Sequence, residues 1–376
     1  MGRVTSRWGT LAAIVMAAGV VVSASAQTPS IQPLQPAPGF IVTRATGISD
    51  DGTVVGWSFN SISGGISTGP VFTYAPDGTR REYSNGTYPT ISGDGRVVAI
   101  TNPDTPTIPP RLYYDNGTFR NLPNVSLAGQ TRQGRVTHLS TDGSVAMLNT
   151  SFVDSIGRST AYRWTESGGA QIPPFPGGSS WNHANGMSSD GSIVVGDWAS
   201  NSTNQSSPML WEDAGPSLSS VTLADGTPID LGILTTVTGD GRTMFLRSDQ
   251  APAGRYMIHD GVANPYMFDS PLGGALSLPT GASYDGSVLV GSLGQFGSWI
   301  WTQETGALRA RDFFIAQGVD VGNLQLFSDL IVSNDGLHFA ADSGSTGSIL
   351  ITIPAPGLAS ALILFGIRAT TRRRRR

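Results

Sequence analysis

One short pattern recurs seven times along this chain of 376 residues, and the copies are 43 to 50 residues apart. Each copy has an Asp-Gly pair, a serine or threonine two residues before the aspartate, and apolar residues three before and four after it. The seven aspartates are Asp51, Asp94, Asp142, Asp190, Asp240, Asp285 and Asp335. A pattern that returns at a near-constant spacing predicts a repeat architecture in which every copy forms the same unit.

Each Asp-Gly pair is expected to lie at the turn of a β-hairpin. Aspartate and glycine both tolerate positive φ, which a type I′ turn requires at its two central positions. The serine or threonine hydroxyl should bond the turn backbone, and the flanking apolar residues, often β-branched, suit buried strands. Each copy therefore predicts two paired strands.

An aromatic-rich segment with a second acid–glycine turn follows six of the seven hairpins, as at Phe72–Tyr74 before Asp77 and at Trp299–Trp301 before Glu304. Two hairpins give four short strands in about 47 residues, the unit of a β-propeller blade. The fold class predicted is all-β, a seven-bladed β-propeller over residues 27–353. A sandwich or a solenoid accommodates seven near-equal copies of this length less well.

The seventh copy lacks an outer strand, because only Ser348–Ile353 follows its hairpin. Ile31–Leu34 precedes Asp51 by the distance at which an outer strand precedes a hairpin elsewhere. We therefore expect the N- and C-terminal strands to close the last blade together, which removes an exposed sheet edge. A short helix is expected at Ala310–Ala316, between blades 6 and 7.

Residues 1–26 have the layout of a secretory signal peptide. Arg3 and Arg7 precede an apolar run, and Ala24 and Ala26 form a small-x-small cleavage site. The segment predicts cleavage before Gln27 by signal peptidase. An uncleaved N-terminal anchor is the alternative.

Residues 354–376 have three ordered features: the prolines of Pro354-Ala355-Pro356, an apolar run over Gly357–Ile367, and a basic end. That end is Arg368, Arg372, Arg373, Arg374, Arg375 and Arg376. Eleven helical residues span about 16 Å, whereas a stable membrane span needs about 20 residues. The segment therefore predicts a short membrane helix and a transient association, with the arginines on the cytoplasmic side.

These features resemble the PEP-CTERM sorting signal of Gram-negative bacteria, with Ala355 where that family usually has an acid. Gly47–Gly56 and Ala161–Trp164 resemble the HAF-type repeats of secreted bacterial proteins. The resemblance implies export across the inner membrane, cleavage near the motif by an exosortase-type protease, and a secreted or cell-surface location. A plain C-terminal membrane anchor is the alternative.

Composition excludes several chemistries. All 23 basic residues are arginine and there is no cysteine, which excludes disulfides, a thiol nucleophile, sulfur-ligated zinc and a P-loop lysine. Eight arginines lie in the two terminal segments, so 15 face 27 acids in the body. An acidic body should repel nucleic acid and anionic polysaccharide. No cofactor and no metal are predicted, because each turn offers one carboxylate where Ca²⁺ needs several oxygen ligands.

Candidate site residues are few. Trp181, His183, Asp197 and Trp198 are expected on the face of the inter-blade loops, where they could stack against and hydrogen-bond a sugar. The alternative places Trp198 in the core and His183 in a solvated loop. His138 and His338 are expected near the axis, and His259 in an aromatic packing column. The G-x-S-x-G string at Gly65–Gly69 is interpreted as a loop, because a nucleophile elbow leads into a helix.

Two functions remain open at this point. The first is a non-catalytic protein of the cell surface or extracellular matrix, an interaction platform whose partner is an exopolysaccharide or a surface protein. The second is a secreted propeller enzyme or lectin that acts on polysaccharide. Two carboxylates about 5–9 Å apart in the channel mouth would favour the enzyme, and a lining of Ser, Gly and Thr would favour the platform.

Overall fold

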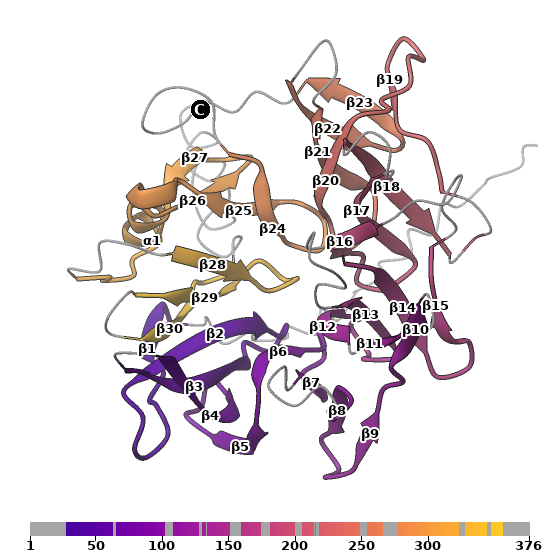
Figure 1. Ribbon diagram of the computed structural model, residues 1–376. Coiled ribbons are helices and arrows are strands. Elements are labelled where there is room, and N and C mark those ends of the chain that lie inside the picture. The colour runs from indigo at the N-terminus through magenta and orange to yellow at the C-terminus, as the bar shows by residue number, and fades with distance from the viewer. Residues whose placement is uncertain are drawn as a thin grey trace, which may run out of the picture. The chain divides into compact units, whose positions relative to one another are not determined.

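The computed structural model describes residues 28–62, 65–101, 108–127, 130–132, 134–150, 159–173, 181–199, 205–213, 215, 218–248, 254–265, 277–322, 328–343 and 347–355. Thr28–Ala355 forms one compact unit, and seven of its eight sheets are the blades of a β-propeller (Figure 1). The predicted fold class and blade number are thereby confirmed. The signal-peptide segment 1–26 and the sorting segment from 356 onward lie outside the described residues.

The first three blades each contain four antiparallel strands in chain order. Blade 1 is β2 (Val42–Ile48), β3 (Val54–Ile62), β4 (Gly65–Tyr74) and β5 (Arg80–Asn85). Blade 2 is β6 (Thr87–Ile91), β7 (Val97–Thr101), β8 (Arg111–Tyr114) and β9 (Phe119–Asn121). Blade 3 is β12 (Gly134–Leu139), β13 (Val145–Thr150), β14 (Ala161–Thr165) and β15 (Gly169–Gln171). A separate pair, β10 (Val125–Leu127) and β11 (Gln130–Arg132), lies between blades 2 and 3 in the sequence.

Blades 4 and 5 do not have four strands: blade 4 has three and blade 5 has five. Blade 4 is β16 (Trp181–Met187), β17 (Ile193–Ala199) and β18 (Ser206–Glu212). The Ser219 N–H donates to the Leu210 carbonyl at 2.8 Å, so the chain still runs beside β18 where a fourth strand is expected. Blade 5 is β20 (Gly232–Val237), β21 (Thr243–Ser248), β22 (Gly254–His259) and β23 (Val262–Pro265), with β19 (Thr222–Leu223) added in parallel at its outer edge.

The last two blades enclose the helix and the closure. Blade 6 is β24 (Pro279–Ala282), β25 (Val288–Ser292), β26 (Ser298–Thr302) and β27 (Gly306–Arg309), with the 3₁₀ turn η1 (Gly294–Phe296) between β25 and β26. Helix α1 (Ala310–Ala316) follows β27, as predicted. Blade 7 has the order β28 (Ser328–Val332), β29 (His338–Asp342), β30 (Ser348–Thr352) and β1 (Ser30–Pro33), counted outward from the innermost strand.

The predicted closure by both ends of the chain is confirmed. Strand β1 pairs antiparallel with β30, with Ile31 opposite Ile351, and the Leu34 N–H continues the pairing to the Ser348 carbonyl at 2.9 Å. The Leu34 side chain is 2% exposed and belongs to the apolar cluster that joins blades 7 and 1. The outer edge of the last blade is therefore covered by the first strand of the chain.

The seven repeated turns differ from the predicted type I′. In each of them the aspartate lacks positive φ and only the glycine has it, between 69° and 82°. The Ser49 carbonyl accepts the Gly52 N–H at 3.0 Å, and the Ser49 N–H donates to the Thr53 carbonyl at 3.0 Å. The loop thus has three residues, a type I turn ending in a left-handed glycine. The predicted type I′ geometry occurs instead in the second hairpin of blade 5, at Asp260 (φ 48°) and Gly261 (φ 81°).

The hydroxyl of each repeat holds its turn, as predicted. Ser92 is fully buried, and its Oγ donates to Asp94 Oδ1 at 2.7 Å and accepts the Val97 N–H at 3.0 Å. In blade 3 the backbone N–H of Ser144 bonds the Asp142 carboxylate, and with the Ser144 and Ser140 hydroxyls it lowers the pKa of Asp142 against the opposing effect of burial. The motif therefore satisfies buried polar groups at the end of each inner strand.

Each innermost strand has a shift in its pairing register, as between Ala45 and Gly47 in β2 and between Ala184 and Gly186 in β16. A β-bulge of this kind bends a strand and redirects its side chains. A Cβ on Gly47 would lie 3.1 Å from Val55 and 3.3 Å from Ile91, so the bulge packs closely on the next blade. The predicted loop at Gly65–Gly69 is wrong, because these residues begin β4 and pair with β3.

Candidate functional site

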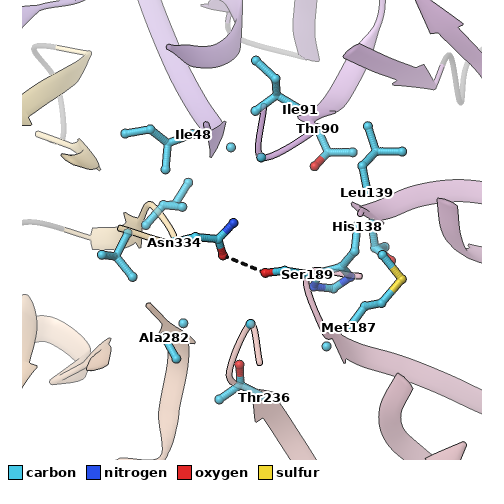
Figure 2. Close-up of a pocket in the computed structure, with 18 of the residues that line it drawn as sticks. Ile48, Thr90, Ile91, His138, Leu139, Met187, Ser189, Thr236, Ala282 and Asn334 are labelled. Atoms are coloured by element: carbon cyan, nitrogen blue, oxygen red, sulfur yellow. Dashed lines mark hydrogen bonds between the residues drawn. The ribbon is translucent and has the colours of Figure 1, made fainter. Parts of the chain in front are cut away.

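The inner ends of the seven innermost strands surround a central cavity of about 310 Å³. Figure 2 shows the side chains that point into it from all sides. The apolar residue three before each repeat aspartate lines this cavity in every blade: Ile48, Ile91, Leu139, Met187, Val237, Ala282 and Val332. The apolar column recognised in the sequence is therefore the wall of the channel.

The polar lining of the cavity consists of hydroxyls, one amide and one imidazole. Thr46, Thr90, Thr137, Thr236 and Thr280 contribute with Ser189, Asn334 and His138. Ser189 Oγ donates to Asn334 Oδ1 at 3.1 Å across the channel, as the dashed line in Figure 2 shows. The residues described as lining the cavity include no carboxylate. Acid–base catalysis by paired carboxylates finds no support in this lining.

A closed ring of hydrogen bonds joins the seven Asp-Gly turns beside this cavity. In six of the seven links a backbone N–H donates to the carbonyl of the residue just before the next blade's aspartate, at 2.6 to 2.8 Å. These bonds run Asp50 to Gly93, Asp94 to Thr141, Thr141 to Ser189, Ser189 to Gly239, Asp240 to Tyr284 and Tyr284 to Asn334. The ring ties every blade to the next at this end of the channel.

The seventh link, between blades 7 and 1, uses a side chain. The Asn334 N–H donates to Asp50 Oδ1 at 3.0 Å, and Asn334 Nδ2 lies 3.4 Å from Asp50 Oδ2. Burial raises the pKa of Asp50, the two Asn334 bonds oppose that rise, and the charges of Asp335 and Asp51 add to it. Asp50, the first acid of the doubled pair in repeat 1, therefore closes the ring where the chain's two ends meet.

Among the described residues, His138 is the one titratable residue that lines the cavity. It stands on β12 at the position that glycine occupies in β2, β16 and β24, and its Nδ1 is buried with no hydrogen-bond partner among the described residues. Burial, followed by the charges of His183 and Arg135, lowers the pKa of His138 to about 4, so the imidazole is neutral at pH 7. The prediction that His138 lies near the axis is confirmed.

The other two histidines outside blade 4 do not enter the cavity. His338 is 4% exposed at the start of β29, its Nδ1 lies 3.1 Å from Thr352 Oγ1, and it lies against Gly52 of blade 1. His259 is 56% exposed and its Nδ1 lies 3.0 Å from Thr243 Oγ1. The predicted role of His259 in inter-blade packing is wrong, because the pairing register puts it one residue beyond the buried column that contains Trp211 and Trp301.

The structure brings together part of the predicted ligand face. His183 and Asp197 lie directly opposite each other on β16 and β17, and Trp181 lies two residues before His183. Trp198 alternates to the other side of the sheet and packs on the core between blades 3 and 4. The expectation of a loop at His183 is wrong, because β16 already begins at Trp181.

The hydrogen bonds of His183 define the tautomer of its neutral form. His183 Nδ1 lies 2.8 Å from Asn185 Oδ1 and therefore donates, and His183 Nε2 lies 3.2 Å from Asn149 Nδ2 and therefore accepts. Asn149 and Asn185 are themselves oriented by bonds to backbone groups, from Asn149 Nδ2 to the Ala184 carbonyl at 2.8 Å and from Asn185 Nδ2 to the Leu234 carbonyl at 2.9 Å. Both ring nitrogens are thus occupied, so His183 is held in place rather than poised as a base.

Asp197 is the buried carboxylate of this patch, 6% exposed. It accepts the Ser206 hydroxyl at 3.1 Å, and Asn185 Nδ2 lies at 3.4 Å. Burial raises the pKa of Asp197, while the Ser206 bond and the charge of His183 lower it in part. The patch offers polar groups and one indole for binding, without a nucleophile–base pair.

Within the described ranges there is no group of three or more His, Asp or Glu side chains placed to hold a metal ion. Among the same residues no helix has the length and apolar character to cross a membrane.

Comparison with known proteins supports the fold and assigns no family or function. No protein-family model and no curated protein matches the sequence. The chain is similar to an oligogalacturonate lyase from Vibrio parahaemolyticus, with a TM-score of 0.55 and 10% identity over 87% of this chain and 98% of that one. It is also similar to the Swd1 β-propeller domain of Myceliophteria thermophila, with a TM-score of 0.49 and 11% identity over 86% and 99% of the two chains. At 10% identity the likeness to the lyase shows a shared fold alone.

Proposed function

We propose that this chain is an exported, non-catalytic β-propeller of the cell surface or extracellular matrix that acts as an interaction platform. The observation that carries the proposal is the channel lining, which has threonine, serine, asparagine and aliphatic side chains, one neutral imidazole and no carboxylate among its described residues. The saturated hydrogen bonds of His183 support it as well. A rigid closed ring presents loops and faces without providing acid–base chemistry.

Export is part of the same proposal and rests on the two terminal segments. Signal peptidase would cut after Ala26, and an exosortase-type protease would cut near Pro354 and Pro356 after a transient membrane association. Strand β1 begins at Ser30 and β30 ends at Thr352. Both cuts would therefore fall outside the strands that close the ring, and processing would leave every blade whole.

Mass spectrometry of the mature protein from its host tests the export. We expect an N-terminus at Gln27 and the absence of the arginines at 372–376. A variant that lacks residues 354–376 should keep the first cut and lose surface processing. A mature protein that retains the whole arginine run would contradict sorting-type cleavage.

A second candidate, a propeller lectin, is favoured by the juxtaposition of Trp181, His183 and Asp197 on β16 and β17. A glycan array with the protein purified from its host tests it, and oligogalacturonate belongs among the probes because of the similar lyase. Binding that is lost in Trp181→Ala and kept in Phe119→Ala, an exposed aromatic of blade 2, would support the lectin. The absence of binding to every glycan on the array would count against the lectin function. Enzymatic turnover of any probe would contradict a non-catalytic role.

A further inference from the structure

An arginine–aromatic stack runs across blades 3, 2 and 1. The Arg135 guanidinium lies 3.7 Å from the centroid of the Tyr88 ring, and Tyr88 meets Trp57 edge to face with 4.9 Å between ring centroids. These residues come from β12, β6 and β3, respectively. Arg135 stands near the beginning of its innermost strand, away from the Asp-Gly turns and therefore on the face predicted to carry ligands.

The stack is held in a conformation that costs free energy. Tyr88 has φ 50°, a left-handed backbone that an aromatic residue adopts only when its surroundings impose it. Thr46 Oγ1 of blade 1 donates to the carbonyl of the next residue, Pro89, at 2.6 Å and keeps this bulge in place. Trp57 Nε1 is buried without a partner among the described residues. Strain of this kind clusters at binding sites, where it fixes a side chain in advance.

Arg135 has an unused hydrogen-bonding edge. The residue as a whole is exposed, although its guanidinium lies over the Tyr88 ring and is itself partly buried. Within the described ranges it makes the contact with Tyr88 and no hydrogen bond or ion pair. A second guanidinium is near: Arg44 of blade 1, whose Nε lies 3.6 Å from Asp342 Oδ2, is close enough that its charge adds to partial burial in lowering the pKa of Arg135, against an opposing effect of Tyr88. Two guanidinium charges, one of them paired with Asp342, thus lie near each other in a body that is otherwise acidic.

We propose that Arg135, oriented by Tyr88 and assisted by Arg44, binds an oxyanion, a carboxylate or sulfate group presented to this face. A guanidinium has a planar fork of N–H donors that matches two oxygens of such a group. Stacking on Tyr88 restrains the plane of Arg135 and leaves the edge of the fork for the ligand. The bound anion would also relieve the repulsion between Arg135 and Arg44. This site uses residues other than those of the Trp181–Asp197 patch, and it does not depend on export.

The negative charge of the body does not oppose this binding at physiological salt. The body has 15 arginines and 27 acids, but the Debye length is about 8 Å at 0.15 M ionic strength. Distant acids are therefore screened, and the contacts made by Arg135 and Arg44 decide whether an oxyanion binds. The expected global repulsion of anionic polysaccharide is compatible with one local site of opposite sign.

Isothermal titration calorimetry of the mature protein tests the site with three probes: a uronic-acid oligosaccharide, its carboxyl-reduced neutral counterpart, and inorganic sulfate. The wild type should bind the acidic oligosaccharide and not the neutral one. Arg135→Gln should weaken binding at least tenfold. Arg135→Lys should weaken it by less, because lysine keeps the charge and loses the planar fork. Arg96→Gln, which removes one exposed arginine beside the Asp94 turn, is the matched control and should bind like the wild type.

The probes also separate the sources of the oxyanion. Sulfate that binds as tightly as the oligosaccharide supports a site for free anions, and binding of the oligosaccharide alone supports a site for a polymer; either result upholds the oxyanion site. The proposal is overturned if no acidic probe binds, if the neutral counterpart binds equally, or if Arg96→Gln loses as much affinity as Arg135→Gln. Unchanged thermal unfolding of Arg135→Gln shows that a loss of binding is not a loss of fold.

Discussion

The backbone N–H of Asn334 donates to the Asp50 carboxylate at 3.0 Å, and this bond joins the last blade to the first. Every other link in the ring of turns uses a backbone carbonyl as the acceptor. At the seam, Asp50 supplies a side-chain oxygen as the acceptor instead, while its own N–H donates to the Gly93 carbonyl at 2.7 Å and so continues the ring into blade 2. The closure of the propeller therefore depends on one acid at this end and on β1 at its outer edge.

Replacement of Asp50 separates its role as an acceptor from its charge. Asp50→Ala leaves the Asn334 N–H without its acceptor and should lower the free energy of unfolding by about 1–3 kcal/mol. Asp50→Asn keeps an acceptor oxygen and should change it by less than about 0.5 kcal/mol at pH 7. Urea unfolding of the two variants measures the difference. Equal losses in both would show that the charge, and not the acceptor, matters.

The free energy of unfolding should depend on pH differently in the wild type and in Asp50→Asn. Because burial raises the pKa of Asp50 in the folded state, the folded protein binds this proton more tightly than the unfolded chain. The contribution of Asp50 to stability therefore falls as pH rises from its unfolded pKa near 3.8 through its folded pKa. Asp50→Asn should lack this decrease when unfolding is followed across that range.

The buried hydroxyl of a repeat turn should be replaceable by threonine but not by alanine. Ser92→Ala leaves the Val97 N–H, which now donates to Ser92 Oγ at 3.0 Å, without an acceptor, and should cost about 1–3 kcal/mol. Ser92→Thr should cost much less, because Thr238 makes the same bonds in blade 5. Ser84→Ala, at an exposed position, is the control and should stay within about 0.5 kcal/mol. A loss in Ser92→Thr as large as in Ser92→Ala would contradict this account.

His138 should make the fold sensitive to mild acid. Its pKa falls from 6.5 to about 4 on folding, so the folded state binds fewer protons than the unfolded chain in that interval. Stability should decline as pH drops from about 6.5 toward 4, by on the order of 3 kcal/mol for this group. His138→Phe should flatten the decline, although His338, whose pKa burial also lowers, retains part of it. NMR of the His138 imidazole in the intact protein would contradict the account if it titrated near 6.5.

The strand contributed by the start of the chain should be worth several kilocalories per mole. Leu34→Ala creates a cavity among Phe72, Ala340 and Leu350 and should lower the free energy of unfolding by about 2–5 kcal/mol. Ile41→Ala is the matched control, since Ile41 is 69% exposed, and should change it by less than about 0.5 kcal/mol. Thermal or urea unfolding measures both. A mild effect of Leu34→Ala would mean that the ring holds without its outer closing strand.

Local patterns were sufficient to predict the blades. The hydroxyl, aspartate and glycine of each repeat make bonds within five residues of one another, so the pattern reports hairpins wherever it occurs. The count of hairpins in turn predicts seven blades, and the missing outer strand predicts β1 beside β30. Turn type and the role of His259 were predicted wrongly, because both depend on a shift of one residue in register: the loop has three residues instead of two, and His259 falls outside the buried column.

The sequence could not predict which residues of different blades contact one another. The pattern specifies pairing inside a blade, but it has no local signal for which residues of different blades meet once seven sheets close around an axis. The Asp50–Asn334 bond joins residues 284 positions apart, and Arg135, Tyr88 and Trp57 come from three blades. The sequence alone thus determined the repeated unit and its number, because hairpin chemistry is local. The tertiary structure decided the hydrogen bonds between neighbouring Asp-Gly turns, the neutral His138 and the arginine stack, because these arise from the geometry of packing between blades.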